Sequence, residues 1–325
     1  MIERLKVGWV GAGFVGQAAH LERFIKFPET KIVALAELRE GLRANVSSSY
    51  NIPNTYKDHK QLLKHNDCDA IIAVVNRRNT FQVAKDILES GRHLLTEKPM
   101  APTKPEAQEL VAIAESKGVV YAVGFMRRYD DGVRRARKVI HDFMQSGELG
   151  KVISLRIFVE AGNDYCGISQ RIMTDEPRLF PPAENIAPSW LSKKWHVEYE
   201  KFVNICSHDI NLIRFLFPEK ISVSAVDFRP KGFSYALLDF GRFPGTLEWG
   251  YRPNDEDSWR EGVEVRFEQG QVSVYLPPAF IRNVSAKVVI RRDSSSDAQK
   301  ASKTTIYGDY SWAFENSDHA FVNSV

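Results

Sequence analysis

Cysteine is scarce in this sequence: only Cys68, Cys166 and Cys206 occur among 325 residues, and they lie far apart. An odd number of cysteines at such distances predicts no disulfide framework and matches no zinc-ligand spacing, so we expect no metal site. The cysteine usage favours the reducing environment of the cytoplasm.

Long apolar runs and a large net charge are also lacking. No run approaches the ~20 apolar residues of a membrane span, and the first six residues, Met1 to Lys6, contain no apolar region of a signal peptide. The net charge is only +3, from 44 basic and 41 acidic residues, so the chain has no field of the kind that nucleic acid or an anionic membrane requires. We therefore expect a cytoplasmic protein with neither partner.

The first 124 residues alternate short apolar runs with helical patterns. The expected strands are 7–10, 32–36, 70–75, 93–96 and 119–123. Continuous apolarity is typical of strands that helices bury on both faces. One expected helix has a capping box, Thr103 with Glu106, and ends at Gly118. This alternation predicts a Rossmann-type, doubly wound parallel sheet in an α/β domain of residues 1–124.

The pattern changes in residues 125–325, where several longer strands alternate apolar and polar residues. The expected strands are 151–160, 221–228, 233–240, 245–251, 262–276 and 284–292, with helices near 132–145 and 208–217 and a polar loop at 292–303. Alternation with a period of two favours an antiparallel sheet that is covered on one face. We therefore expect a C-terminal α+β domain with an open, mostly antiparallel sheet.

A glycine-rich turn joins the first expected strand to the following helix. Its residues are Gly11, Ala12, Gly13, Phe14, Val15 and Gly16. In this pattern the first glycine permits the tight turn, the second lets the backbone approach a pyrophosphate, and the third allows close packing of helix and strand. The helix N-terminus would then offer N–H groups to the phosphates. These six residues predict a dinucleotide-binding turn.

Glu37, at the end of the second expected strand, indicates which dinucleotide binds. A carboxylate there accepts hydrogen bonds from the adenosine ribose and repels a 2′-phosphate, so we expect NAD. NADP is the less favoured alternative, since Arg39, two residues further on, could reach a 2′-phosphate.

Two further segments carry a resemblance to a known family. Glu97-Lys98-Pro99 follows the strand at 93–96, and Val123-Gly124-Phe125-Met126-Arg127-Arg128-Tyr129-Asp130 comes at the end of the strand at 119–123. Together with the glycine turn they resemble the Gfo/Idh/MocA family, the group of glucose–fructose oxidoreductase and inositol dehydrogenase. The resemblance implies a Rossmann domain followed by an open sheet that often forms the oligomer interface, and hence a homodimer or homotetramer here.

The resemblance also implies a site. Lys98 would lie between nicotinamide and substrate, Glu97 near the nicotinamide ribose, and Pro99 after a cis bond. Lys98 is independently plausible, because a lysine at the carboxyl end of a parallel strand points into the ligand crevice. Desolvation beside a cationic ring would lower its pKa and let it pass a proton.

The second-domain motif of the family departs from its usual form. His208 matches the family's histidine, but Asn204 stands where an aspartate is usual and Asn211 where another acid is common. We expect Ser207 to cap a helix that starts at His208, whose dipole would keep the imidazole neutral as a proton acceptor. Asn204 does not titrate and could only orient substrate by hydrogen bonds.

Two other positions are expected near the ligands. Asn76 retains the first asparagine of a Pro-Asn-x-x-His pattern and would border the cofactor, whereas Arg77 and Arg78 face water or an anionic substrate group. Arg127 lies where family members contact substrate.

These residues support three hypotheses. The first is NAD-dependent hydride transfer at a hydroxyl or carbonyl carbon of a sugar, cyclitol or related polyol, with Lys98 and His208 catalytic. The second uses bound NAD transiently for glycoside cleavage or epimerisation, and Asn204 keeps it open. The third is a catalytically silent NAD-binding sensor.

Overall fold

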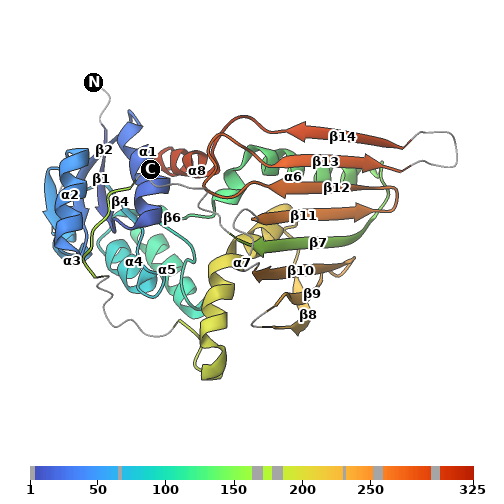
Figure 1. Ribbon diagram of the computed structural model, residues 1–325, viewed down its shortest axis with the longest axis horizontal. Helices are drawn as coiled ribbons and strands as arrows, with labels where there is room; N and C mark the ends of the chain where they lie inside the picture. Colours follow the sequence, from blue (N-terminus) through green and yellow to red (C-terminus); the bar gives the residue numbers. More distant parts are fainter. Residues whose placement is uncertain are drawn as a thin grey trace. The chain divides into compact units, whose positions relative to one another are not determined.

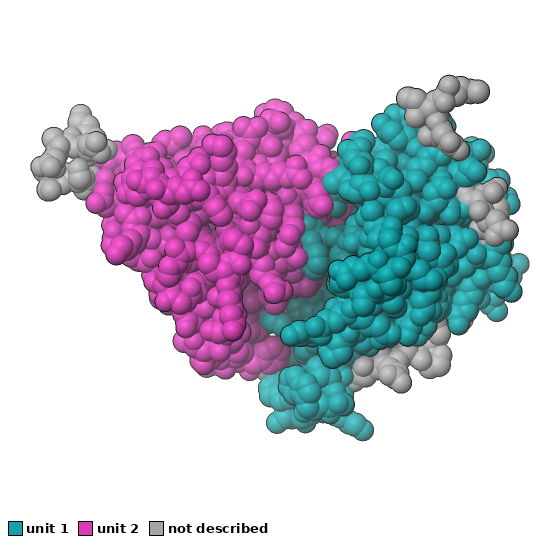
Figure 2. Space-filling model, turned by 180° about the vertical axis from the view of Figure 1, so that it is seen from behind, with its two compact units in different colours: residues 1–125, 169–204, 317–325 teal, residues 126–168, 205–316 magenta. Residues whose placement is uncertain are grey.

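The computed structural model describes residues 4–64, 68–162, 171–177, 186–229, 232–251, 259–293 and 301–325. Two compact units are present, and neither is continuous in sequence (Figure 2). Unit 1 comprises residues 1–125, 169–204 and 317–325, and unit 2 comprises residues 126–168 and 205–316. The predicted division falls at residue 124, whereas unit 1 also takes in two later segments.

Unit 1 is built on a parallel sheet whose described strands follow the order β3-β2-β1-β4-β5-β6. The strands are β1 (Leu5–Val10), β2 (Thr30–Ala36), β3 (Asn54–Tyr56), β4 (Ala70–Ala73), β5 (His93–Thr96) and β6 (Tyr121–Val123). The helices are η1 (Gly16–Leu21), α1 (Glu22–Lys26), α2 (Glu40–Tyr50), α3 (His59–Leu63), α4 (Thr80–Glu89) and α5 (Lys104–Lys117). This order confirms the predicted doubly wound sheet.

The inner strands of this sheet are buried because helices cover both faces. Every residue of β4 is buried, and only Lys31 of β2 is exposed. One core cluster gathers Trp9, Phe24 and Leu35 with Phe321 from α8 (Ala313–Val322). A second contains Ile71, Ile87 and Leu110. The later turns of α8 therefore complete the core of unit 1.

Unit 2 contains a mostly antiparallel sheet in the order β14-β13-β12-β11-β7-β10-β9-β8, in which β7 and β10 pair in parallel. Its strands are β7 (Val152–Ala161), β8 (Ser222–Asp227), β9 (Ser234–Asp239), β10 (Pro244–Tyr251), β11 (Arg260–Phe267), β12 (Gly270–Leu276), β13 (Lys287–Arg292) and β14 (Ser302–Tyr307). The predicted open sheet is confirmed, although the single strand expected over 262–276 is a hairpin of β11 and β12.

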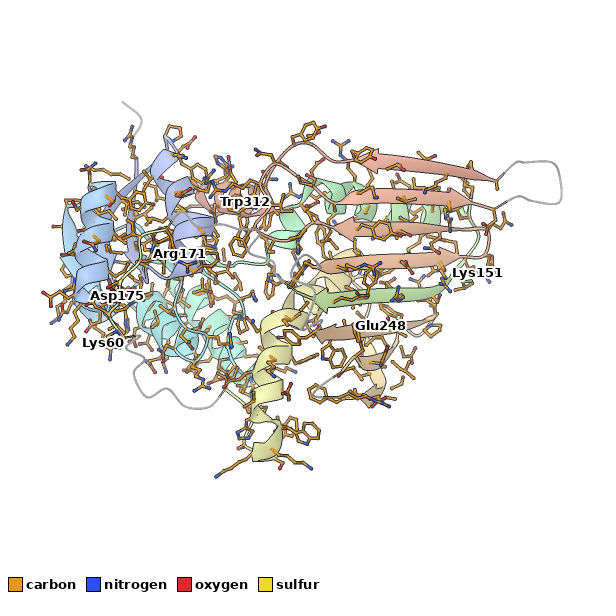
Figure 3. All side chains as sticks on the ribbon, in the orientation of Figure 1. Lys60, Lys151, Arg171, Asp175, Glu248 and Trp312 are labelled. Carbon is orange, nitrogen blue, oxygen red and sulfur yellow. The ribbon has the colours of Figure 1, made fainter. Side chains whose placement is uncertain are left out.

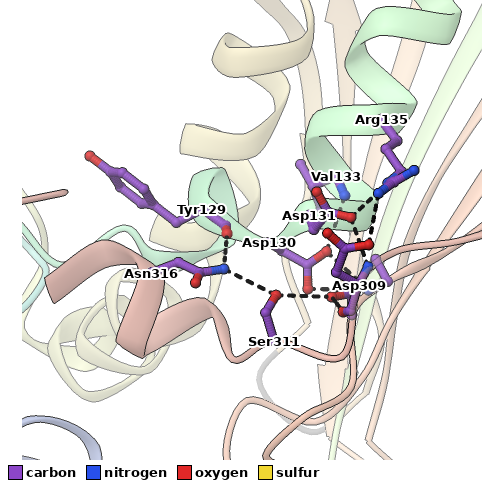
Figure 4. Close-up of polar contacts among 10 residues, drawn as sticks. Tyr129, Asp130, Asp131, Val133, Arg135, Asp309, Ser311 and Asn316 are labelled. Carbon is purple, nitrogen blue, oxygen red and sulfur yellow. Dashed lines mark hydrogen bonds and ion pairs between the residues drawn. The ribbon is translucent and has the colours of Figure 1, made fainter. Parts of the chain in front are cut away.

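Helix α6 (Asp131–Ser146) lies against β12 and β13, behind the sheet in the view of Figure 1. Its start is fixed to the sheet by Asp130, whose carboxylate accepts the N–H groups of Val133 at 3.0 Å and Ala286 at 3.0 Å (Figure 4). Asn316 donates to the main-chain oxygen of Tyr129 at 3.0 Å in the same region. Among the described residues, no helix is long and apolar enough to cross a membrane.

Helix α7 (His196–Leu216), preceded by η3 (Lys193–Trp195), corrects one expectation. Ser207 and His208 lie in the interior of this helix rather than at its start, so Ser207 is not an N-cap. The dipole effect that we expected at His208 therefore does not apply, because it is confined to the first and last turns.

Candidate active site

The three glycines of the turn have different surroundings. Gly11 has φ +90°, and a Cβ there would lie 2.3 Å from the main-chain oxygen of Val74. A Cβ at Gly16 would lie 2.8 Å from the main-chain oxygen of Gly11. At Gly13, by contrast, a Cβ would meet no described atom within 4 Å. The first and third glycines are thus required by packing, while the second has open space beside it, as expected of a position that a phosphate would approach.

Ala12 and Phe14 lie in the same turn. Ala12 makes its contact through the backbone, and Phe14 makes its contact through the ring. The N–H of Ala12 donates to Glu37 Oε2 at 2.8 Å. The ring of Phe14 lies 4.7 Å from the guanidinium of Arg171. Val15 has helical backbone angles and forms the N-cap of η1, where the helix begins. The predicted turn is therefore assembled at the carboxyl end of β1.

Glu37 is largely buried at the end of β2. Its Oε1 accepts a hydrogen bond from Arg39 Nε at 2.8 Å, in addition to the bond from Ala12. Burial would raise the pKa of this carboxyl, but the hydrogen bonds from Arg39 and Ala12 outweigh burial and lower the pKa. Glu37 is thus an ionised acceptor beside the glycine turn, and Arg39 is paired with it.

The Glu97-Lys98-Pro99 segment follows β5, and the Lys98–Pro99 bond is cis, as the resemblance implied. Lys98 Nζ donates to Asn204 Oδ1 at 3.3 Å and also to the main-chain oxygen of Asn204. Both residues belong to unit 1. The structure therefore brings together two of the predicted site residues that are 106 positions apart in sequence.

His208 lies four residues after Asn204 on α7, in the part of the helix that belongs to unit 2. Asn211, three residues further on, accepts a hydrogen bond from Arg128 Nε.

His20 is the centre of a largely buried network with Glu97 and Asp318 that the sequence did not predict. His20 of η1 bonds through Nε2 to Glu97 Oε1 at 3.0 Å and through Nδ1 to Asp318 Oδ1 of α8 at 2.8 Å. A Cβ at Gly124 would lie 2.6 Å from Glu97 Oε1, so the absence of a side chain at this glycine leaves room for the carboxylate. The N–H of Lys98 also donates to Glu97 Oε2 at 3.2 Å.

The charges of this network stabilise one another. Burial alone would lower the pKa of His20, but the attraction and hydrogen bond of Asp318, together with those of Glu97, raise the pKa to about 10. Burial raises the pKa of Asp318, and the imidazolium opposes that rise. His20 and Asp318 share one hydrogen bond, and this pair therefore retains the imidazolium proton well above neutral pH.

The remaining predicted residues lie in two different surroundings. Asn76 Oδ1 accepts the N–H of Arg78 at 3.0 Å, and Arg78 forms an ion pair with Glu200 at 2.7 Å. Arg127 is buried in unit 2, where it makes two hydrogen bonds to Glu261 and donates to the main-chain oxygen of Pro277 at 2.9 Å. Its guanidinium is thus engaged within unit 2, which favours a structural role for this residue.

Comparison with known proteins identifies the first unit. Residues 5–125 match the GFO_IDH_MocA family model, described as "Oxidoreductase family, NAD-binding Rossmann fold". The levoglucosan dehydrogenase of Pseudarthrobacter phenanthrenivorans is 25% identical over 234 residues, covering 69% of this chain and 54% of the relative. The inositol 2-dehydrogenase of Salmonella paratyphi B is 29% identical over 150 residues, covering 45% and 43%. The chain thus spans about half the length of the curated relatives it matches.

Solved structures share the fold over nearly the whole chain. A 3-ketoreductase from Actinomadura kijaniata, in complex with TDP-benzene and NADP, has a TM-score of 0.73 at 17% identity and covers 99% of this chain and 89% of its own. A dehydrogenase from Clostridium difficile has a TM-score of 0.71 at 17% identity and covers 99% and 90%. The resemblance seen in the sequence is therefore confirmed for the first unit, where residues 5–125 match the model of the Gfo/Idh/MocA oxidoreductase family, and the solved structures show that the fold continues over the rest of the chain.

Proposed function

We propose that this protein is an NAD-dependent oxidoreductase acting on a hydroxyl or carbonyl carbon of a sugar, cyclitol or related polyol. The observation that carries the proposal is Lys98, placed at the carboxyl end of β5 with its Nζ bonded to Asn204 of α7. Ligands bind at the carboxyl ends of the strands in such sheets. Relatives named inositol 2-dehydrogenase and levoglucosan dehydrogenase support this substrate class.

Lys98 would donate a hydrogen bond to the oxygen on the reacting carbon. That oxygen becomes more negative as the carbon loses hydride, and an ammonium group stabilises the developing charge. The bound nicotinamide supplies the hydride-transfer chemistry. Asn204, which accepts from Lys98, would orient the ammonium group and a substrate hydroxyl together.

His208 would accept the proton of the substrate hydroxyl during oxidation and return it during reduction. Its place in the sequence, where the family has a histidine, supports this role. Glu97 would lie beside the nicotinamide ribose, with Asn76, Glu37 and the glycine turn holding the rest of the cofactor.

Asn204 favours one second candidate, in which the redox step is transient and the net reaction is glycoside cleavage or epimerisation. The usual aspartate could share in proton transfer, whereas an amide cannot titrate. Acid–base work would then fall on Lys98 and His208 alone.

A panel of sugars and polyols, incubated with the purified protein and NAD and followed at the NADH absorbance, tests the proposal. Substrate-dependent NADH formation is the expected result. Product formation without accumulation of NADH would favour the second candidate. Binding of NAD without any turnover across the panel would instead support a silent sensor and contradict the proposed enzyme.

We also propose self-association through the sheet of unit 2, as a homodimer or homotetramer. Strand β9 exposes two large side chains on one face of the sheet, Tyr235 at 43% and Leu237 at 50%. Apolar groups exposed together in this way mark interaction surfaces. Light scattering should give an oligomer mass that Leu237→Arg lowers, and a monomeric wild-type protein would contradict this proposal.

A further inference from the structure

Residues 171–177, here called the strap, lie between β7 and α7 in sequence but belong to unit 1. Two hydrogen bonds join Ile172 to Gln17. The N–H of Ile172 donates to Gln17 Oε1 at 2.9 Å, and the main-chain oxygen of Ile172 accepts from Gln17 Nε2 at 3.0 Å. Gln17 is buried in η1, directly after the glycine turn. The strap is therefore anchored beside the predicted phosphate site, and Figure 3 labels two of its residues, Arg171 and Asp175.

Glu176 anchors the other end of the strap to α2. Its carboxylate accepts the N–H of Gly41 at 3.0 Å and the N–H of Leu42 at 2.9 Å, in the first turn of the helix. A Cβ at Gly41 would lie 2.9 Å from Glu176 Oε2, so the absence of a side chain permits this approach. The two backbone bonds lower the pKa of Glu176, which is consequently ionised at neutral pH.

The N-terminus of α2 is close in sequence to the ribose-binding acid. The helix begins at Glu40, three residues after Glu37. Free N–H groups at a helix N-terminus form an anion site, and two arginines stand next to this one. Arg39 is paired with Glu37, and Arg43 donates to the main-chain oxygen of Glu37 at 2.7 Å. The N–H groups of the helix and the two arginines would suit a 2′-phosphate. However, the carboxylate of Glu176 already accepts the N–H groups of Gly41 and Leu42.

We propose that the strap is part of the dinucleotide site and that Glu176 selects NAD over NADP by filling the anion site at the start of α2. A 2′-phosphate would have to displace this carboxylate or accept a like charge beside it. Arg171 has a different task, because it lies over Phe14 of the glycine turn. Its guanidinium supplies positive charge for the pyrophosphate, which both dinucleotides share.

This inference rests on the proposed cofactor, and its test measures binding rather than turnover. Titration calorimetry on the full chain gives the Kd for NAD and for NADP. The wild-type protein should bind NAD more tightly. Glu176→Ala should lower the ratio of the NADP Kd to the NAD Kd by about tenfold or more, since like charges in contact cost several kcal/mol. Arg171→Ala should weaken both dinucleotides by a similar factor.

Asp175→Ala is the matched control, because it removes the same charge from the adjacent exposed residue. Its ratio of the two Kd values should equal that of the wild type. Glu176→Gln keeps the size of the side chain and removes its charge, so it should shift the ratio in the same direction if Glu176→Ala folds poorly. Tighter binding of NADP by the wild type, or an unchanged ratio in both Glu176 variants, would overturn the inference. Failure of the wild type to bind either dinucleotide would overturn the proposed function itself.

Discussion

His20 Nδ1 and Asp318 Oδ1 lie 2.8 Å apart, although 298 positions separate the two residues in sequence. The bond joins the helix after the glycine turn to α8. Both side chains are almost fully buried, at 2% and 0% exposed. Since Glu97 binds the other nitrogen of the same imidazole, one residue links α8 to the motif that presents Lys98.

Asp318→Ala should therefore destabilise unit 1 strongly. Removing one partner of a buried ion pair leaves an uncompensated charge and costs about 3–5 kcal/mol. The urea midpoint, followed by tryptophan fluorescence, measures the loss, since Trp9 lies in the same core. Glu109→Ala removes the partner of the surface residue Lys85 in the same unit and should have little effect. Equal midpoints for the two variants would contradict this assignment.

The pH dependence of stability should report on His20. Its pKa in the folded protein, about 10, lies above the ordinary 6.5. The stabilisation from its bound proton is therefore complete below about pH 6.5 and is lost as the pH rises through about 10. We expect the urea midpoint of the wild type to fall between pH 7 and pH 10, and that of His20→Gln to fall less. If the urea midpoints of the wild type and of His20→Gln fall equally over this pH range, the proton that stabilises the fold is not the one on His20.

Alanine substitutions at Gly11 and Gly13 should affect different properties: the first should lower stability, and the second should weaken cofactor binding. Gly11→Ala forces a Cβ to 2.3 Å from the Val74 oxygen at a positive φ, so it should lower stability by about 1–3 kcal/mol. Gly13→Ala places its Cβ in open space and should leave the melting temperature unchanged while weakening NAD binding by about tenfold or more. Calorimetry and thermal melting on both variants check this contrast. Unaltered NAD affinity in Gly13→Ala would exclude the pyrophosphate from this position.

Lys98→Ala should lower turnover by about 10²–10⁴-fold while NAD still binds. Lys98 would act on the substrate oxygen and not on the cofactor phosphates, so the effect should appear mainly in kcat. Lys104→Ala, which removes an exposed lysine six residues further on, is the control. Turnover that survives the loss of Lys98 would remove this residue from the mechanism.

Asn204→Asp would restore the acid that is usual in the family. The new carboxylate would face Lys98 Nζ, since Asn204 Oδ1 lies 3.3 Å from it. An opposite charge so close favours the ammonium form, and we expect the alkaline limb of the kcat–pH profile to move up by about one pH unit or more. Asn204→Ser serves as a neutral control. A profile that is the same in all three proteins would mean that Lys98 does not govern this limb.

Much of unit 1 could be predicted because its signals are local. The five predicted strands are present, and the turn from Gly11 to Gly16 lies where expected. β3 was missed because Asn54, Thr55 and Tyr56 form too short and too polar a run. β14 was missed for a related reason: residues 302–307 are mostly exposed, and the expected loop ran to Lys303.

The parts of the site that could not be predicted depend on distant contacts. Nothing near His20 in sequence indicates Glu97 or Asp318, although a histidine among Ala18, Ala19 and Leu21 signals a buried polar group that needs partners. Glu176 is one acid in a polar stretch, and only the fold places it at α2. The expected helix start at His208 was wrong because α7 begins twelve residues earlier, at His196.

The return of α8 to the first unit has a consequence for synthesis of the protein. N-terminal domains generally fold first as a chain leaves the ribosome, at about 5–20 residues per second. Here unit 1 lacks Asp318 and Phe321 until translation has passed all of the residues of unit 2. During that interval the imidazole of His20 lacks its aspartate partner, and we expect the core of unit 1 to stay incomplete for longer than the core of a contiguous Rossmann domain would.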